Sequence, residues 1–166
     1  PHNEISGSVV IFKDEAGELK VTWDKIADGF RNAGSDVIEV ELADRYEKIN
    51  ENRFAIGSTE EDYHKLTAEI KSRGVTRIIH MASSGRKGIE SIHDMDDCQK
   101  RGVYSLFYLT RALIEQRYSH DIDIVIISDR AEEVIQEDKI LKPHNASVMA
   151  MAKVVTQEYP NLKCRC

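Results

Sequence analysis

Short apolar segments alternate with amphipathic ones along most of the chain. Residues 8–12 are apolar and β-branched after an initial serine, as in a strand that is covered on both faces. From Leu19 to Ala33 apolar positions recur at spacings of three and four, and Gly34 follows, so the pattern predicts a helix that ends there. Apolar and acidic residues alternate in residues 36–42, which predicts a strand with one less buried face.

The alternation continues to the end of the chain. Ser58 followed by Glu61 has the spacing of a capping box, and predicts the start of a helix that stops at Gly74. Pro143 and Pro160 are expected at the beginning and the end of the last helix. Further strands are predicted at residues 53–56, 75–83, 123–128 and 162–166, and the longest helix at residues 94–117.

Strands that alternate with helices predict right-handed β-α-β units around a mostly parallel sheet. At 166 residues the chain is long enough for a two-sided core, so we expect residues 1–166 to form a single α/β, Rossmann-like three-layer sandwich. A dinucleotide-binding version of this fold carries Gly-x-Gly-x-x-Gly after its first strand. Here Asp14 and Glu15 follow that strand and Gly17 is the only glycine available, so the fold is predicted to be truncated and to lack the glycine fingerprint.

Composition and charge narrow the possible partners. The net charge is −6 and no basic cluster is interleaved with aromatic residues, so nucleic acid is not an expected partner. The longest apolar runs fall well short of the roughly 20 residues of a membrane span, so no membrane partner is expected. Cys98, Cys164 and Cys166 are odd in number and favour a reducing, cytoplasmic setting. Because the chain begins at Pro1 and stops within a predicted strand, we expect an excised fragment.

Tyr159 and Lys163 have the Tyr-x-x-x-Lys spacing of short-chain reductases. That chemistry requires both side chains on one helical face, where the ammonium group lowers the pKa of the phenol. Pro160 follows the tyrosine immediately and is expected to end the helix, so we assign no catalytic role to the pair. None of the three cysteines has the surroundings of a nucleophile.

A group of potential metal ligands lies near the start of the longest predicted helix. Its members are His93, Asp94, Asp96, Asp97 and Cys98. Their spacing does not match a calcium loop, and acidic side chains at a helix N-terminus interact favourably with the helix dipole. We therefore predict helix capping rather than metal binding, with Cys98 as a small core residue.

Two further polar groups lie near the carboxyl ends of predicted strands, where open α/β sheets bind ligands. Gly85-Arg86-Lys87-Gly88 offers two cations to a phosphate, but two glycines three residues apart are weak evidence, and a solvated loop is expected. Glu39 and Glu41 lie near the place of a ribose-binding acid, but without the glycine loop they are expected to be solvated. The sequence therefore indicates no catalytic, cofactor-binding or metal-binding residue.

The C-terminal third of the chain resembles a known family. The runs from Lys153 to Arg165 and from Gly102 to Leu113 are similar to the structural subdomain of modular polyketide synthase ketoreductases, and Ile78-Ile79-His80 and Val9 to Phe12 support the match. The resemblance covers nearly the whole chain and is loosest between Ala43 and Gly57. A ketoreductase of that family resembles two Rossmann-like halves. The second binds NADPH and carries the catalytic residues, and the first is a truncated unit that stabilises it.

The resemblance implies a non-catalytic structural subdomain of a polyketide synthase, or of a mixed polyketide and peptide synthase. NADPH is expected on the catalytic half, which is absent from this sequence, so no cofactor is expected here. The implied partner is that half or an adjacent synthase domain. Two alternatives stay open: an independent nucleotide- or phosphate-binding domain that uses Gly85 to Gly88, and a phospho-receiver. The receiver hypothesis lacks an acceptor aspartate after Ile79, where His80 follows.

Overall fold

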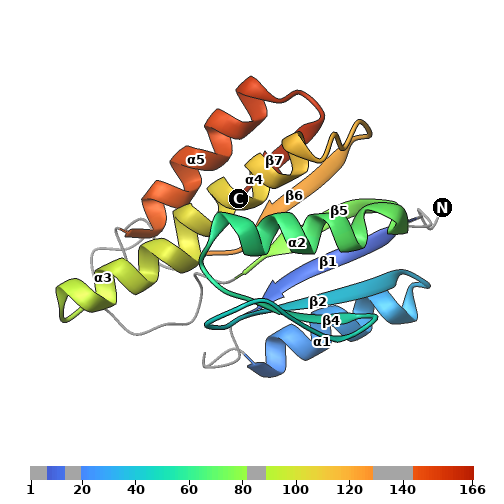
Figure 1. The fold of residues 1–166 in the computed structure, drawn as a ribbon, viewed down its shortest axis with the longest axis horizontal. Coiled ribbons are helices and arrows are strands. Elements are labelled where there is room, and N and C mark those ends of the chain that lie inside the picture. Colours follow the sequence, from blue (N-terminus) through green and yellow to red (C-terminus); the bar gives the residue numbers. More distant parts are fainter. Residues whose placement is uncertain (1–6, 14–19, 82–88, 129–143) are drawn as a thin grey trace, which may run out of the picture.

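The computed structural model describes residues 7–13, 20–81, 89–128 and 144–166. Within these ranges seven strands form one sheet in the order β3-β4-β2-β1-β5-β6-β7, with helices beside it (Figure 1). The strands are β1 (Ser8–Lys13), β2 (Asp36–Leu42), β3 (Glu47–Asn50), β4 (Arg53–Ile56), β5 (Val75–His80), β6 (Ile122–Ile126) and β7 (Leu162–Arg165). The α-helices are α1 (Lys20–Asn32), α2 (Glu60–Ile70), α3 (Ile92–Gln99), α4 (Ser105–Glu115) and α5 (His144–Glu158).

Every strand pair is parallel except that of β3 with β4. The chain starts in the centre of the sheet at β1 and moves outward through β2 to β4. It then returns to β5 on the other side of β1 and continues through β6 to β7. The direction of winding therefore reverses between β1 and β5. The predicted Rossmann-like α/β fold with a mostly parallel sheet is confirmed.

Strand β3 is not predicted by the sequence pattern. All four of its residues are exposed, so no apolar alternation marks it as a strand. It lies at the edge of the sheet and forms an antiparallel hairpin with β4. It is the one antiparallel strand among those described.

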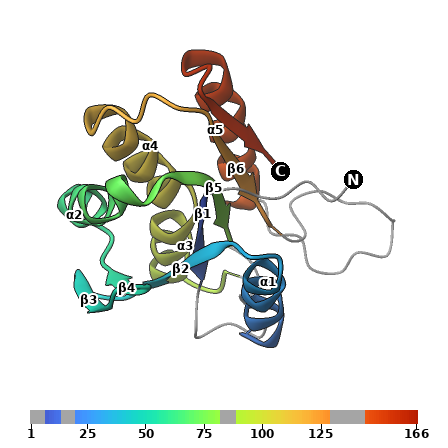
Figure 2. The ribbon, with the colours of Figure 1, turned by 90° about the vertical axis from the view of Figure 1, so that its right-hand side faces the viewer.

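The two faces of the sheet are covered unequally (Figure 2). Helix α1 lies on one face, which we call the α1 face, where Trp23 and Ala27 form a small buried cluster with Val9 and Ile11. Helices α2, α4 and α5 cover the opposite face, which we call the α4 face, and enclose a much larger core. Alternation along β2 explains the division, because Ile38 and its even-numbered neighbours point to the α4 face.

Helix α2 begins one residue later than predicted. Thr59, and not Ser58, is the N-cap, and its hydroxyl accepts a hydrogen bond of 3.3 Å from the backbone N–H of Asp62. The carboxylate of Asp62 in turn accepts a bond of 2.9 Å from the N–H of Gly57. Thr59 thus takes the N-cap role predicted for Ser58, while Asp62 binds the backbone of Gly57 rather than that of the N-cap, so the full capping box is not formed.

The longest predicted helix is composite, because a π-helical segment, Lys100–Tyr104, joins α3 to α4. Helix α3 begins at the N-cap Ser91, whose hydroxyl accepts from the N–H of Asp94 at 3.1 Å and donates to the carboxylate of Asp94 at 2.7 Å. The predicted capping role of Asp94 is confirmed. In the described part of the chain, no helix has the length and apolar character needed to cross a bilayer.

Candidate functional site

The carboxyl ends of β1, β2 and β5 form the candidate site, because ligands of open α/β sheets bind where the winding reverses. The loops that follow β1 and β5 contain Asp14, Glu15, Gly17 and the run from Gly85 to Gly88, all of which lie outside the described residues. The site is therefore built from the strand ends themselves and from the helices packed on them. The two faces of the sheet supply different chemistry to this edge.

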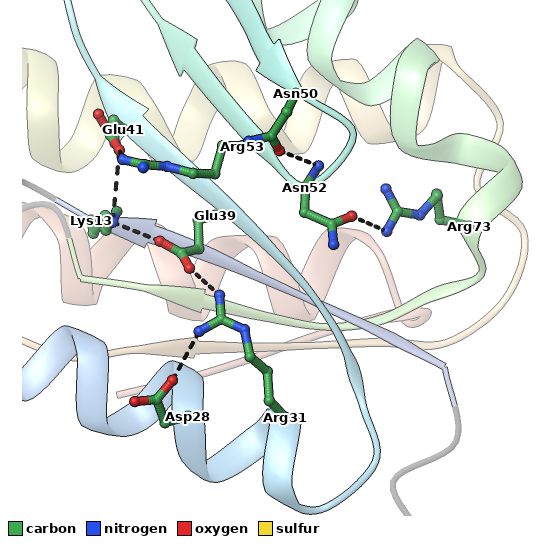
Figure 3. A network of polar contacts seen from close by, with 9 residues as sticks. All are labelled: Lys13, Asp28, Arg31, Glu39, Glu41, Asn50, Asn52, Arg53 and Arg73. Atoms are coloured by element: carbon green, nitrogen blue, oxygen red, sulfur yellow. Dashed lines mark hydrogen bonds and ion pairs between the residues drawn. The ribbon is translucent and has the colours of Figure 1, made fainter.

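On the α1 face, Lys13 ends β1 with its side chain only 6% exposed (Figure 3). Its ammonium donates a hydrogen bond of 2.6 Å to Glu39 Oε2 and lies 3.7 Å from Glu41 Oε1. Both glutamates come from the adjacent strand β2, whose register with β1 places Glu41 directly opposite Lys13. A buried lysine is thus neutralised by two carboxylates on the next strand.

Two arginines extend this cluster on either side of β2. Arg31 of α1 contacts Glu39 and also Asp28, the latter at 3.0 Å, and Arg53 of β4 contacts Glu41 (Figure 3). The prediction that Glu39 and Glu41 are solvated is wrong, because their side chains are only 12% and 19% exposed. Burial alone would raise the pKa of Glu39, but hydrogen bonds from Lys13 and Arg31 outweigh it and hold that pKa below its usual value.

The charged cluster opposes the binding of a phosphate at the carboxyl ends of β1 and β2. A phosphate near the end of β1 would meet the carboxylates of Glu39 and Glu41, which already hold the ammonium of Lys13. To bind the phosphate, Lys13 would have to leave both partners and expose two partly buried negative charges. The arrangement therefore stabilises the join between β1 and β2 and disfavours an anionic ligand on this face.

On the α4 face, a hydrogen-bonded chain of three neutral side chains links α2, α4 and β5. They are Tyr63, Ser105 and His80. The hydroxyl of Tyr63 in α2 donates a hydrogen bond of 2.6 Å to Ser105 Oγ at the start of α4. Ser105 Oγ lies 2.8 Å from Nε2 of His80, the last residue of β5. The ring of His80 stacks on Phe12, with ring centroids 5.6 Å apart. Ser105 Oγ therefore lies between the phenol of Tyr63 and the imidazole of His80 and makes a hydrogen bond with each.

A serine within hydrogen-bond distance of a histidine is the geometry of an activated nucleophile. Here, however, Tyr63, His80 and Ser105 are all completely buried, so no substrate reaches the hydroxyl. Burial also lowers the pKa of His80 to about 4, which keeps the ring uncharged at neutral pH. Nδ1 of His80 has no hydrogen-bond partner in the described structure. No sequence pattern indicates that these three residues meet, since consecutive members are 17 and 25 residues apart.

The pair with reductase spacing is separated in the structure. Tyr159 lies just beyond the end of α5, and Lys163 lies in β7, where its ammonium donates a 2.5 Å hydrogen bond to Asp121. The predicted end of the helix near Pro160 is confirmed, because α5 stops at Glu158, before both residues. On the same strand, burial raises the pKa of the Cys164 thiol to about 12, and the pKa of Cys166 is also raised, which opposes thiolate formation.

The acidic side chains of α3 form ion pairs with basic side chains of the π-helical segment that follows. Asp96 lies 2.6 Å from Lys100, and Asp97 lies 3.5 Å from Arg101, each at the i,i+4 spacing of helical ion pairs. Cys98 is half-buried, so its expected place in the core is only partly realised. These side chains stabilise the helix and do not converge on one point.

Comparisons with known proteins agree with this geometry. A family model described as "Beta-ketoacyl synthase-like, N-terminal" matches residues 7–166. No curated protein matches the chain. Among solved structures, the chain is similar to an adenylation, ketoreductase and pseudo Asub multidomain structure of a keto acid-selecting NRPS module, with a TM-score of 0.83 and 26% identity. The aligned region covers 98% of this chain but only 13% of the multidomain chain.

Two further structures share the fold at lower identity. An N-terminal ketoreductase from a macrolactin assembly line has a TM-score of 0.77 and 20% identity, over 99% of this chain and 32% of that chain. The NADH-dependent enoyl-[acyl-carrier-protein] reductase of Aquifex aeolicus VF5 has a TM-score of 0.68 and 18% identity, over 98% and 78%. The chain thus spans about a third or less of the assembly-line structures that it matches, and most of a single reductase.

Proposed function

Because the chain belongs to the Beta-ketoacyl synthase-like, N-terminal family, we propose that it is the non-catalytic structural subdomain of a ketoreductase in a polyketide, or mixed polyketide and peptide, synthase. Its role is to support the NADPH-binding catalytic half or a neighbouring domain of the same assembly line. The match to small parts of two ketoreductase-containing chains supports this assignment.

The observation that carries the proposal is the chemistry of the strand ends. In a nucleotide-binding relative, this edge would present backbone N–H groups and a positive field to a pyrophosphate. In this chain, Lys13 is held by Glu39 and Glu41, and His80 is sealed beneath α4 with Ser105. These described side chains are engaged within the protein, which supports a structural role over a cofactor-binding one.

A supporting role also requires a surface that meets a partner. Six of the nine large exposed apolar side chains among the described residues lie in α3, the π-helical segment, α4 and α5 or directly after α5. They are Ile92, Met95, Tyr104, Phe107, Val154 and Tyr159. Ile92 is 90% exposed, although it belongs to a well-capped helix. We assign this helical layer to contact with the catalytic half.

Titration of the purified chain with NADPH tests the proposal. We expect no saturable change in NADPH fluorescence, whereas an intact ketoreductase used as the positive control saturates. A micromolar dissociation constant for this chain would contradict the proposal. It would favour the alternative of a nucleotide- or phosphate-binding domain, which also predicts that nucleotides raise the melting temperature by mass action.

A further inference from the structure

From side chains on the outer surface of α2 and α4, we infer a binding site for a divalent transition-metal ion such as Zn²⁺. The ligands are Glu60 and His64 of α2 and Glu115 at the end of α4, whose potential ligand atoms all lie within 4.8 Å of one another. The site is distant in sequence from the strand ends described above and does not rest on the proposed function.

The geometry of the three ligands requires only small side-chain movements to bind an ion. Nε2 of His64 lies 2.8 Å from Glu115 Oε2 and 3.9 Å from Glu60 Oε1. Ligand atoms about 2.1 Å from a tetrahedral zinc ion are about 3.4 Å apart, which falls between these two distances. Glu60 and His64 share one helical face at the i,i+4 spacing, so both can bind one ion without a change in the backbone.

The helices that carry the ligands are fixed to each other by buried hydrogen bonds. Tyr63 of α2 bonds Ser105 of α4 at 2.6 Å, and the hydroxyl of Tyr118, just after α4, donates to the carbonyl of Thr67 in α2 at 2.6 Å. These bonds hold α2 and α4 in a defined position on either side of His64. Ligands on rigid helices lose little freedom when they bind a metal ion, which favours binding.

Charge also favours a cation at this place. Two carboxylates face one guanidinium, that of Arg111, which lies 3.0 Å from Oε1 of Glu60 and 3.0 Å from Oε1 of Glu115. Because Oε1 of Glu60 also faces His64, Glu60 would share this oxygen between the arginine and the ion or bind the ion through Oε2. With a neutral imidazole the group therefore keeps a net negative charge. Arg111 binds the oxygen of Glu115 that does not face His64, so it orients the carboxylate as an outer partner of the site. Its guanidinium also packs over the ring of Phe107, at 5.8 Å.

The ligand set selects the class of metal ion. Magnesium and calcium prefer oxygen ligands alone, whereas an imidazole with carboxylates suits zinc and its first-row neighbours. The side chains of His64, Glu60 and Glu115 are 27%, 38% and 46% exposed, so water can complete the coordination. A bound ion would connect α2 to α4 on the solvent side of the buried hydrogen bonds.

Calorimetric titration of the EDTA-treated chain with ZnCl₂ tests the site, with CoCl₂ as a spectroscopic probe of coordination. We expect one ion per chain, and affinity at least roughly tenfold weaker in His64→Gln and Glu115→Gln. The matched controls are Glu61→Gln, on the same helix in an ion pair with Lys65, and His93→Gln on α3, and both should titrate like the unmodified chain.

Two results would overturn the inference. One is the absence of saturable zinc binding by the unmodified chain. The other is equal binding by the His64→Gln and Glu115→Gln variants, which would place the ion elsewhere, for example on the cysteines. Circular dichroism of each variant establishes that it is folded, so weaker binding is not confused with unfolding. Retained zinc binding alongside NADPH binding would contradict the proposed function alone.

Discussion

The two faces of the sheet differ in the side chains that they bury at the ends of the strands: charged ones on the α1 face and neutral ones on the α4 face. On the α1 face, a small core around Trp23 ends at the strand termini in a charged cluster of lysine, arginine and glutamate. On the α4 face, a large core ends in the uncharged chain of Tyr63, Ser105 and His80. Both arrangements engage the described side chains at the carboxyl ends of the strands, one through ion pairs and the other through burial. The difference means that the faces should respond differently to mutation and to pH.

The largest expected effect is on the thinner core. Trp23 is 1% exposed and is the largest side chain of the α1 face cluster, so Trp23→Ala should lower the free energy of unfolding by about 3–5 kcal/mol. Urea denaturation measures the change. The control is Val21→Ala on the same helix, where the side chain is 65% exposed and the expected change is within about 0.5 kcal/mol. Equal effects of the two substitutions would mean that α1 does not contribute to the cooperative core.

The next effect tests the charged cluster. Lys13→Met leaves Glu39 and Glu41 partly buried without the ammonium and should cost about 3 kcal/mol in the free energy of unfolding, because a buried charge loses its partner. The double variant Lys13→Met/Glu39→Leu makes the site more like the uncharged face, and should be more stable than Lys13→Met alone. Urea denaturation of Lys13→Met, Glu39→Leu and the double variant gives the comparison. A double variant as unstable as the sum of the two single variants would show that the two residues do not interact.

As the pH is lowered, the stability contributed by His80 on the uncharged face should be lost before that contributed by Glu39 on the charged face. His80 has a pKa of about 4 in the fold against an ordinary value of 6.5, so the unfolded chain binds the proton more readily between these values. Stability is therefore complete above pH 6.5 and falls as the pH is lowered to about 4, by about 3 kcal/mol in total. Glu39, whose pKa is lowered from 4.5, contributes stability that is lost only at more acidic pH.

Unfolding free energies measured from pH 7 down to about pH 3 separate the two contributions. His80→Asn should flatten the slope between pH 6.5 and pH 4, whatever its effect on absolute stability. Glu39→Gln should keep that slope and change the profile only below about pH 4.5. An unchanged slope in the His80 variant would show that another group causes the acid sensitivity.

The smallest effect concerns one hydroxyl. Tyr63→Phe removes the hydrogen bond to Ser105, which keeps His80 as its other partner, so a loss of about 1 kcal/mol is expected in urea denaturation. Tyr104→Phe is the control, because its side chain is 45% exposed. If both substitutions have the same effect, the chain of neutral groups contributes nothing beyond packing.

The sequence predicted the parts of the fold that depend on local pattern. Strands β1, β2, β5, β6 and β7 and the helix ends at Gly34 and Gly74 follow from apolar spacing and from glycines, which have φ values of 85° and 62°. Strand β3 was missed because its four residues are exposed and pair only at the sheet edge. The cap of α2 was misplaced because Ser58 and Thr59 are both good N-caps, and only the backbone conformation decides between them.

The site was less predictable because its contacts are distant in sequence. Glu39 was expected in solvent, since alternation along β2 places it on the less apolar face. Its partner Lys13 is 26 residues away and meets it only through the parallel pairing of β1 with β2. His80 and Ser105 likewise meet only when α4 packs on β5. Hydrophobic pattern indicates which face of an element is buried, but it does not identify the polar partner across a sheet.

The π-helical segment between α3 and α4 holds about one residue more than an α-helical turn of the same rise. With this extra residue in the wide turn, Ser105 faces His80 and Glu115 faces His64. Deleting one residue from Lys100–Tyr104 would convert the wide turn to an α-helical turn and leave α4 in place, whereas a deletion within α4 would turn every later residue of that helix by about 100°. The segment is therefore the place in this long helix at which a change of length is tolerated best.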